Sequence, residues 1–157
     1  VYKRQVNTPA SIYAESFTVG ATDDEDNIAG FSSRGPVSID GSFRLKPDIS
    51  APGVGITSSL LNGNYGWNSG TSMAAPHVAG LVALLISADP ALRGQVDEIE
   101  QIIRRTALPR TSEQGCGDLP GDALPNNTYG WGRIDAQRAY RFATAEFFYL
   151  PVMQREK

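Results

Sequence analysis

The longest apolar stretch of the chain runs from Gly70 to Ile86 and carries a hydrophobic or small residue at almost every position. A helix that is apolar on all sides is buried, so this pattern predicts a central helix. Pro76 fits only in the first turn of a helix, which places the helix start close to Ser72. Several residues in its first half are small enough to let neighbouring backbones approach closely: Ala74, Ala75, Ala79 and Gly80.

Shorter runs of β-branched and aromatic residues, bounded by turn residues, are typical of strands. They occur at residues 12–22, 28–32, 48–51 and 54–60. Residues 62–66 have the composition of a turn. The acidic run at residues 23–27 is interpreted as an exposed turn. A solvated turn is favoured there over a calcium site, because the spacing of an EF-hand is absent.

The C-terminal half contains two further helical patterns. Val96, Ile99, Ile102 and Ile103 recur at helical spacing and predict an amphipathic helix that ends at Leu108-Pro109. Asp89-Pro90 provides an N-cap and a helix-starting proline ahead of it. Residues 108–129 are expected to form a long polar loop, and a last helix is predicted from about residue 134 to 143.

Short strands followed by a buried helix indicate an α/β fold with a mostly parallel sheet. Parallel neighbours need a crossover connection, usually a helix, and none is predicted within residues 12–60. The strands therefore either pair antiparallel or have parallel partners elsewhere, which favours an additional N-terminal part of the fold. Residues 1–5 back-translate to the end of a transposase adapter (GTG TAT AAG AGA CAG) and are interpreted as a cloning or assembly scar.

Composition excludes few function classes. The net charge is −3 over 157 residues, so no basic surplus is available for nucleic-acid phosphates. No uninterrupted apolar run reaches the length of about 18 residues that would indicate a membrane-spanning helix. Cys116 is the one cysteine, and it is either a free thiol or paired with a cysteine outside this chain.

Ser72 lies at the predicted start of the central helix, where the first backbone N–H groups have no helical acceptor. These groups and the helix dipole would stabilise the oxyanion of a tetrahedral intermediate. A serine in this position is more often a helix cap than a nucleophile, so position alone does not identify a catalytic site.

The segment Gly70-Thr71-Ser72-Met73-Ala74-Ala75-Pro76-His77-Val78-Ala79-Gly80 resembles the nucleophile segment of the subtilisin-like serine proteases, the subtilase family. Four other segments resemble family signatures in the family's order: 18–21 (TVGA), 31–36 (FSSRGP), 46–53 (KPDISAPG) and 130–135 (GWGRID). The resemblance extends over about residues 9–143 and is strongest to the bacillopeptidase-like branch. It implies that residues 6–145 are the C-terminal part of a subtilisin-like catalytic domain, incomplete by itself, with residues 146–157 as a tail or linker.

This resemblance also implies roles for individual residues. Ser72 would be the acylating nucleophile, and its own backbone N–H would help to form the oxyanion hole with support from Thr71. Ser69 and Gly70 would face the leaving-group side of the cleft. Met73 would lie beside the nucleophile, where oxidation of its sulfur would block the site.

The family's catalytic Asp, its catalytic His and its oxyanion Asn precede the serine and have no counterpart in this chain. His77, the single histidine, matches a non-catalytic position of the motif. Five residues along a helix place it about 140° around the axis from Ser72, pointing into the interior. We therefore expect a serine endopeptidase whose activity requires a missing N-terminal half, and negligible activity of this chain alone. The alternative is a pseudoprotease that serves as a binding or scaffold module.

The remaining expectations follow from the family. The partners would be protein or peptide substrates and the missing half of the domain. The chemistry needs no cofactor, although a structural calcium ion is possible in the complete domain, with Asp48 as a weak candidate ligand. An extracellular or cell-envelope location is expected. Asn126-Asn127-Thr128 matches the acceptor pattern for N-glycosylation.

Overall fold

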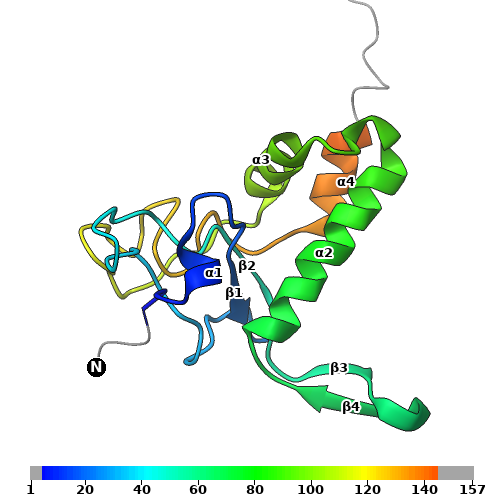
Figure 1. Ribbon diagram of the computed structural model, residues 1–157, viewed down its shortest axis with the longest axis horizontal. Helices are drawn as coiled ribbons and strands as arrows, with labels where there is room; N and C mark the ends of the chain where they lie inside the picture. Colours follow the sequence, from blue (N-terminus) through cyan, green and yellow to red (C-terminus); the bar gives the residue numbers. More distant parts are fainter. Residues whose placement is uncertain (1–4, 145–157) are drawn as a thin grey trace, which may run out of the picture.

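The computed structural model describes residues 5–144 (Figure 1). The predicted tail at residues 146–157 and the first four residues of the predicted scar lie outside the described residues. The elements, in chain order, are α1 (Pro9–Ile12), β1 (Val19–Thr22), β2 (Ile49–Pro52), β3 (Ile56–Ser59), β4 (Tyr65–Asn68), α2 (Thr71–Ala88), α3 (Val96–Thr106) and α4 (Ala136–Thr144). Short 3₁₀ turns lie at Leu61–Gly63 and Pro90–Leu92.

β1 and β2 form a buried parallel pair, with Val19 opposite Ile49 and Ala21 opposite Ala51. The chain between them contains no helix, so the argument that a parallel pair within residues 12–60 would need one is wrong. The connecting chain instead folds back onto β1. The Ser32 hydroxyl accepts a hydrogen bond from the Ala21 N–H at 3.1 Å, and the Ala29 N–H donates to the Ala21 carbonyl at 2.9 Å.

The predicted strand at residues 12–22 is therefore shorter than expected, and its first residue belongs to α1. The predicted strand at 28–32 is wrong: only Ile28 forms a bridge, with Thr22. The segment turns instead of extending, because the Ser32 N–H bonds back to the Ala29 carbonyl at 3.0 Å. On its other side, β2 is flanked by the segment that leads into α4, where the Ser50 N–H donates to the Gly132 carbonyl at 2.8 Å.

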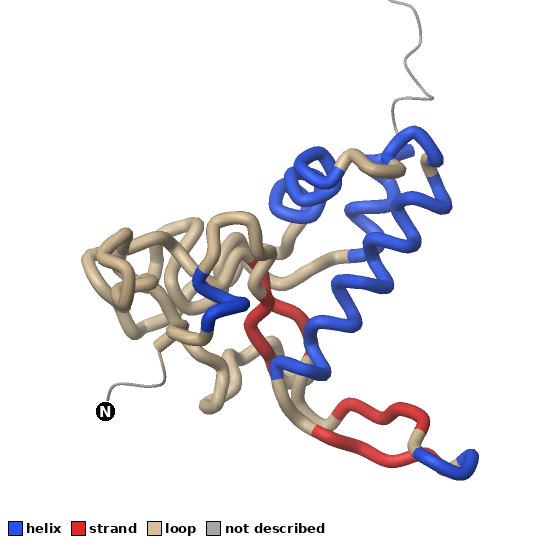
Figure 2. The backbone as a smooth tube through the Cα atoms, viewed as in Figure 1, coloured by secondary structure: helices blue, strands red, loops and turns tan. Residues whose placement is uncertain are grey.

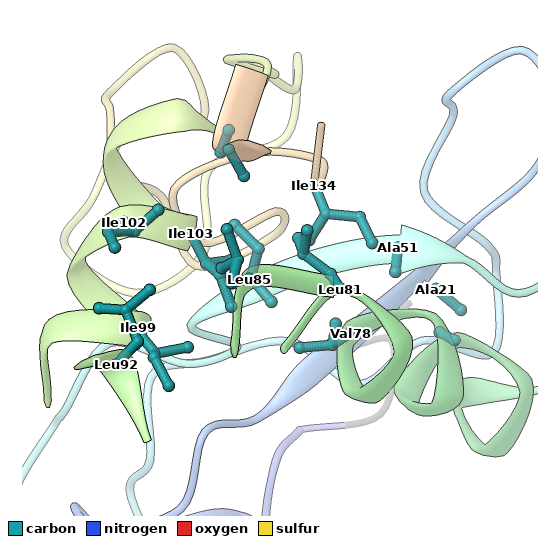
Figure 3. Close-up of a cluster of buried hydrophobic side chains, with 14 of the residues drawn as sticks. Ala21, Ala51, Val78, Leu81, Leu85, Leu92, Ile99, Ile102, Ile103 and Ile134 are labelled. Carbon is teal, nitrogen blue, oxygen red and sulfur yellow. The ribbon is translucent and has the colours of Figure 1, made fainter. Parts of the chain in front are cut away.

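One face of α2 lies on β1 and β2 and, farther along, on α4, which also packs against α3 (Figures 1 and 2). Its buried residues Ala74, Val78, Leu81 and Leu85 meet apolar side chains of the sheet and the other helices (Figure 3). Ile99, Ile102 and Ile103 of α3 join this core as predicted, whereas Val96 is exposed. The core therefore depends on α2, which also carries the predicted nucleophile.

The opposite face of α2 is exposed at Ala75, Ala79, Ala83 and Leu84, so the prediction of a helix buried on all sides is wrong for residues 5–144. No described element covers that face. His77 is exposed too, which overturns the expectation that it points into the interior. By length and composition alone, α2 (mean hydropathy 1.5) could cross a bilayer, a property it shares with core helices of soluble proteins.

β3 and β4 form an antiparallel hairpin that extends away from the rest of the molecule (Figure 2). The prediction of a strand within 54–60 is confirmed, but β4 and the turn at Leu61–Gly63 replace part of the predicted turn. The hairpin exposes large apolar side chains, notably Leu61 (87%), Tyr65 (77%) and Trp67 (77%). An isolated two-stranded hairpin is only marginally stable, and exposed apolar side chains of this size are unusual on a free surface.

The polar segments are more tightly anchored than the sequence indicated. Asp26, in the turn expected to be solvated, pairs with Arg110 and Arg133 and so ties this turn to the long loop. Asn126 is 1% exposed, and its amide donates to the carbonyls of Arg110 and Ala123 at 2.8 and 3.0 Å. An enzyme cannot reach this amide in the folded chain, so Asn126 has a structural role and is not an accessible glycosylation acceptor.

Candidate active site at the start of α2

The turn that leads into α2 is held by the end of β2. Gly70 is extended (φ 163°), and its N–H donates to the Gly53 carbonyl at 2.7 Å. A Cβ atom on Gly53 would lie 2.7 Å from the Ala21 side chain and 2.8 Å from the Gly70 carbonyl oxygen. Only glycine fits there, so the close approach of β2 and the turn fixes where the helix begins.

Ser72 is the second residue of α2 and is exposed. The prediction that the helix begins close to Ser72 is therefore confirmed. Gly70 at the N-cap has no side chain that could cap the helix, and no described group accepts a hydrogen bond from the N–H of Thr71 or Ser72. Uncapped N–H groups at a helix start attract negative charge, so they can stabilise an oxyanion beside the Ser72 hydroxyl.

Pro76 lies in the second turn of α2, not in the first as predicted. A proline cannot donate the hydrogen bond that the residue four positions earlier would normally accept. That residue is Ser72, so its carbonyl lacks the usual helical donor. The helix tolerates this loss because both residues lie on its exposed side.

The other predicted site residues surround Ser72 in the same turn. The Ser69 hydroxyl accepts a hydrogen bond from the Gly55 N–H at 2.9 Å, which ties the end of β4 to the loop before β3. Thr71 is exposed and Met73 is half-buried. The five residues thus form one compact turn, in which Ser69 and Gly70 hold the shape and Ser72 presents its hydroxyl to solvent.

No general base lies next to Ser72 in the described part of the chain. The His77 Nδ1 atom is 2.9 Å from the Met73 carbonyl, one turn back along the same helix. None of the described hydrogen bonds involves the Ser72 hydroxyl. The arrangement therefore offers a nucleophile and oxyanion donors, but not the proton acceptor that acyl transfer needs.

Asp48, the predicted weak cation ligand, is engaged by positive side chains. One carboxylate oxygen accepts from Lys46 Nζ at 2.6 Å and from the Thr18 N–H at 2.8 Å, and the other faces Arg104 at 3.2 Å. Within residues 5–144 there is no group of three or more residues that could together hold a metal ion. The calcium site stays a prediction for the complete domain.

Sequence reasoning missed this buried ion-pair network. Arg104 also bonds Glu100 at 2.9 Å and lies over the ring of Phe17. Burial raises the pKa of Glu100, and the positive charge of Arg104 opposes that shift. The lysine two positions before Asp48 was a visible signal, but nothing in the sequence placed Arg104 against the same carboxylate.

The comparison with known proteins decides the family. The sequence pattern of the subtilase family matches residues 2–132. The chain belongs to the subtilase family. This match confirms the resemblance that the motif around Ser72 indicated.

Several proteases are similar to this subtilase chain. It is 45% identical over 133 residues to Bacillopeptidase F and 40% identical over 122 residues to Minor extracellular protease Vpr, both of Bacillus subtilis (strain 168). These alignments cover 83% and 74% of the chain, but only 8% and 14% of the relatives. It is also 34% identical over 139 residues to the human Membrane-bound transcription factor site-1 protease, covering 87% of the chain and 12% of that protein.

Solved structures agree on the fold. The Clostridium perfringens CspB protease superposes with a TM-score of 0.67 at 28% identity, over 88% of this chain and 29% of that one. The subtilase chain thus corresponds to under a third of that solved protease. The prediction of an incomplete subtilisin-like α/β fold is confirmed.

Proposed function

We propose that this chain provides the nucleophile of a serine endopeptidase. The Ser72 hydroxyl would attack the carbonyl carbon of the scissile peptide bond, while a general base takes the hydroxyl proton. The substrate carbonyl oxygen becomes an oxyanion that accepts a hydrogen bond from the Ser72 N–H. The amine leaves with the proton, and water then hydrolyses the acyl-enzyme. One observation carries this proposal: Ser72 is exposed in an uncapped first turn of a long helix.

The base has to come from residues outside the described part of the chain, because His77, the single histidine, lies about 140° around the helix axis from Ser72 and cannot reach its hydroxyl. We infer that another part of the catalytic domain supplies it and packs on the exposed face of α2. The exposed apolar residues there support this inference, since a large uncovered apolar face marks an interaction site. The chain alone would then have negligible peptidase activity.

We further propose that the complete protein cleaves protein or peptide substrates outside the cell or in the cell envelope. The name of Minor extracellular protease Vpr supports this location. The chemistry requires no cofactor, because the nucleophile, the base and the oxyanion donors are all protein groups. Thr71 and Met73 would flank the substrate cleft, and Ser69 and Gly70 would lie on its leaving-group side.

A fluorophosphonate probe tests the proposal, because it reacts with a serine only where a base and oxyanion donors activate it. A longer polypeptide that contains this chain together with the rest of the catalytic domain should be labelled. Ser72→Ala should abolish labelling, whereas Ser87→Ala, an exposed serine near the other end of α2, should not change it. The 157-residue chain should remain unlabelled. A folded longer protein that is not labelled would instead support the pseudoprotease reading, and labelling of the short chain would contradict the missing base.

A further inference from the structure

A pocket of about 490 Å³ lies between two loops that the peptidase mechanism does not use. Its lining includes Arg34 and Pro36 from the chain after β1, Phe43 farther along, and residues 114–119 of the long loop. None of the residues around Ser72 lines it. The volume is within the range of small-molecule sites, so the pocket can hold a ligand of several heavy atoms.

Arg34 is the unusual member of this lining because it is 3% exposed and has no acidic partner within residues 5–144. Its Nη1 donates to the Gln114 side-chain oxygen at 2.7 Å, and its Nε has no acceptor among the described residues. A buried guanidinium without a counter-charge is strongly disfavoured, since desolvation of the charge is not compensated. An anionic ligand next to Arg34 would compensate this cost.

The remaining walls restrict which anion fits. Phe43, Pro36 and Leu119 supply apolar surface, and the exposed carboxylate of Asp118 adds a negative charge. Asp118 repels a doubly charged phosphate more strongly than a singly charged carboxylate, and a carboxylate can accept hydrogen bonds from the part of the guanidinium that Gln114 does not use. An N–H or ammonium group on the same ligand could face Asp118.

We propose that this pocket binds the carboxylate of an apolar amino acid or of a peptide C-terminus, with Arg34 as the anchor. The carboxylate pairs with the Arg34 guanidinium and the apolar side chain lies against Phe43 and Leu119. This pocket does not include the residues around Ser72, so the binding proposal can be tested independently of the peptidase proposal.

Cys116 lines the same pocket and is the one cysteine of the chain, so its alkylation reports occupancy directly. We expect N-acetyl-leucine to slow the reaction of Cys116 with iodoacetamide several-fold in the 157-residue chain. Leucinamide, which has no carboxylate, should not protect the thiol. Free leucine protecting better than N-acetyl-leucine assigns the site to amino acids, and the reverse assigns it to peptide ends. Equal protection by leucinamide, or none by either carboxylate, overturns the proposal.

Variants test whether Arg34, and not a neighbouring residue, anchors the ligand. Arg34→Gln keeps a hydrogen-bonding side chain of similar length and should abolish protection, whereas Arg93→Gln, which removes an exposed arginine, should not. If Arg34→Gln does not fold, the ligand series on the unaltered chain still decides the question. Asp118→Asn should leave protection by N-acetyl-leucine in place. Protection that arises only in Asp118→Asn would show that Asp118 itself is the partner of Arg34, and would overturn the proposal.

Discussion

The two faces of α2 differ in what they contact. The closed face, formed by Ala74, Val78, Leu81 and Leu85, packs inside the chain against β1, β2 and the other helices (Figure 3). The open face, formed by Ala75, Ala79, Ala83 and Leu84, is exposed along with Ser72 and His77. Both faces are apolar, yet only the closed face is covered by other elements within residues 5–144.

This difference shows which part of the molecule is self-contained. On the closed side, apolar residues are packed together and the buried charges around Asp48 are paired. On the open side, no base lies next to Ser72 within residues 5–144, and the large apolar side chains of the hairpin of β3 and β4 are exposed. The family, in which solved proteases are much longer than this chain, provides a reason for the contrast.

The largest change in stability is expected from the ion pairs on the closed side. Asp48→Asn keeps the shape of the side chain but leaves Lys46, whose side chain is 3% exposed, without its anion. Breaking a buried pair in this way costs about 3–5 kcal/mol of the free energy of unfolding. Urea denaturation of the 157-residue chain measures it. Asp40→Asn, at an exposed ion pair with Arg44, is the control and should have a much smaller effect.

A cavity in the closed face should cost nearly as much. Leu85 is fully buried among Leu92, Ile99 and Ile103, so Leu85→Ala is expected to lower the free energy of unfolding by about 2–5 kcal/mol. The same denaturation experiment detects the loss. An unchanged midpoint would mean that α2 does not form this core in solution.

The neighbouring residue gives a matched test of the open face. Leu84 is 39% exposed, and Leu84→Ala should change the stability of this chain by only about 0.5 kcal/mol. In the longer polypeptide, where the open face is proposed to be covered, the same substitution should cost as much as a core substitution. A small effect in both proteins would contradict the proposed cover on α2.

The sequence predicted best those elements whose signals are local. The start of α2 close to Ser72 was predicted correctly, although Pro76, the residue used to place it, lies in the second turn. The helix α3 followed from the spacing of Ile99, Ile102 and Ile103. The family motif then predicted Ser72 as the nucleophile, which its position alone could not do, and this role stays a prediction. Each of these patterns lies within a short continuous segment of the sequence, so it can be recognised without knowing which distant residues are in contact.

Other features depend on contacts that are far apart in sequence. An apolar pattern shows that a face of α2 tends to be buried, but not whether its partner lies in the same chain, so the exposure of the open face and of His77 was missed. The parallel pairing of β1 and β2 was missed because the connecting loop is held by single hydrogen bonds at Ser32 and Ala29. The burial of Arg34 likewise depends on loops whose course no periodicity predicts.

The smallest expected effect concerns the charge of Glu100, at the edge of the closed side. Burial raises the pKa of this carboxyl above its usual value of 4.5, so the folded chain holds the proton more tightly than the unfolded chain. The resulting contribution to stability is complete below that usual value and is lost as the pH rises through the folded-state pKa. Glu100→Gln should remove this loss. The variant should therefore gain stability relative to the original chain as the pH rises from about 4, near the usual pKa of glutamate, to neutrality. Chemical denaturation at a series of pH values measures the difference, with Glu98→Gln, an exposed residue of the same helix, as the control. If the free energy of unfolding has the same pH dependence in the Glu100→Gln variant and in the original chain, ionisation of Glu100 does not destabilise the folded state. The charges around Asp48 would then be more open to water than the packing of the closed side implies.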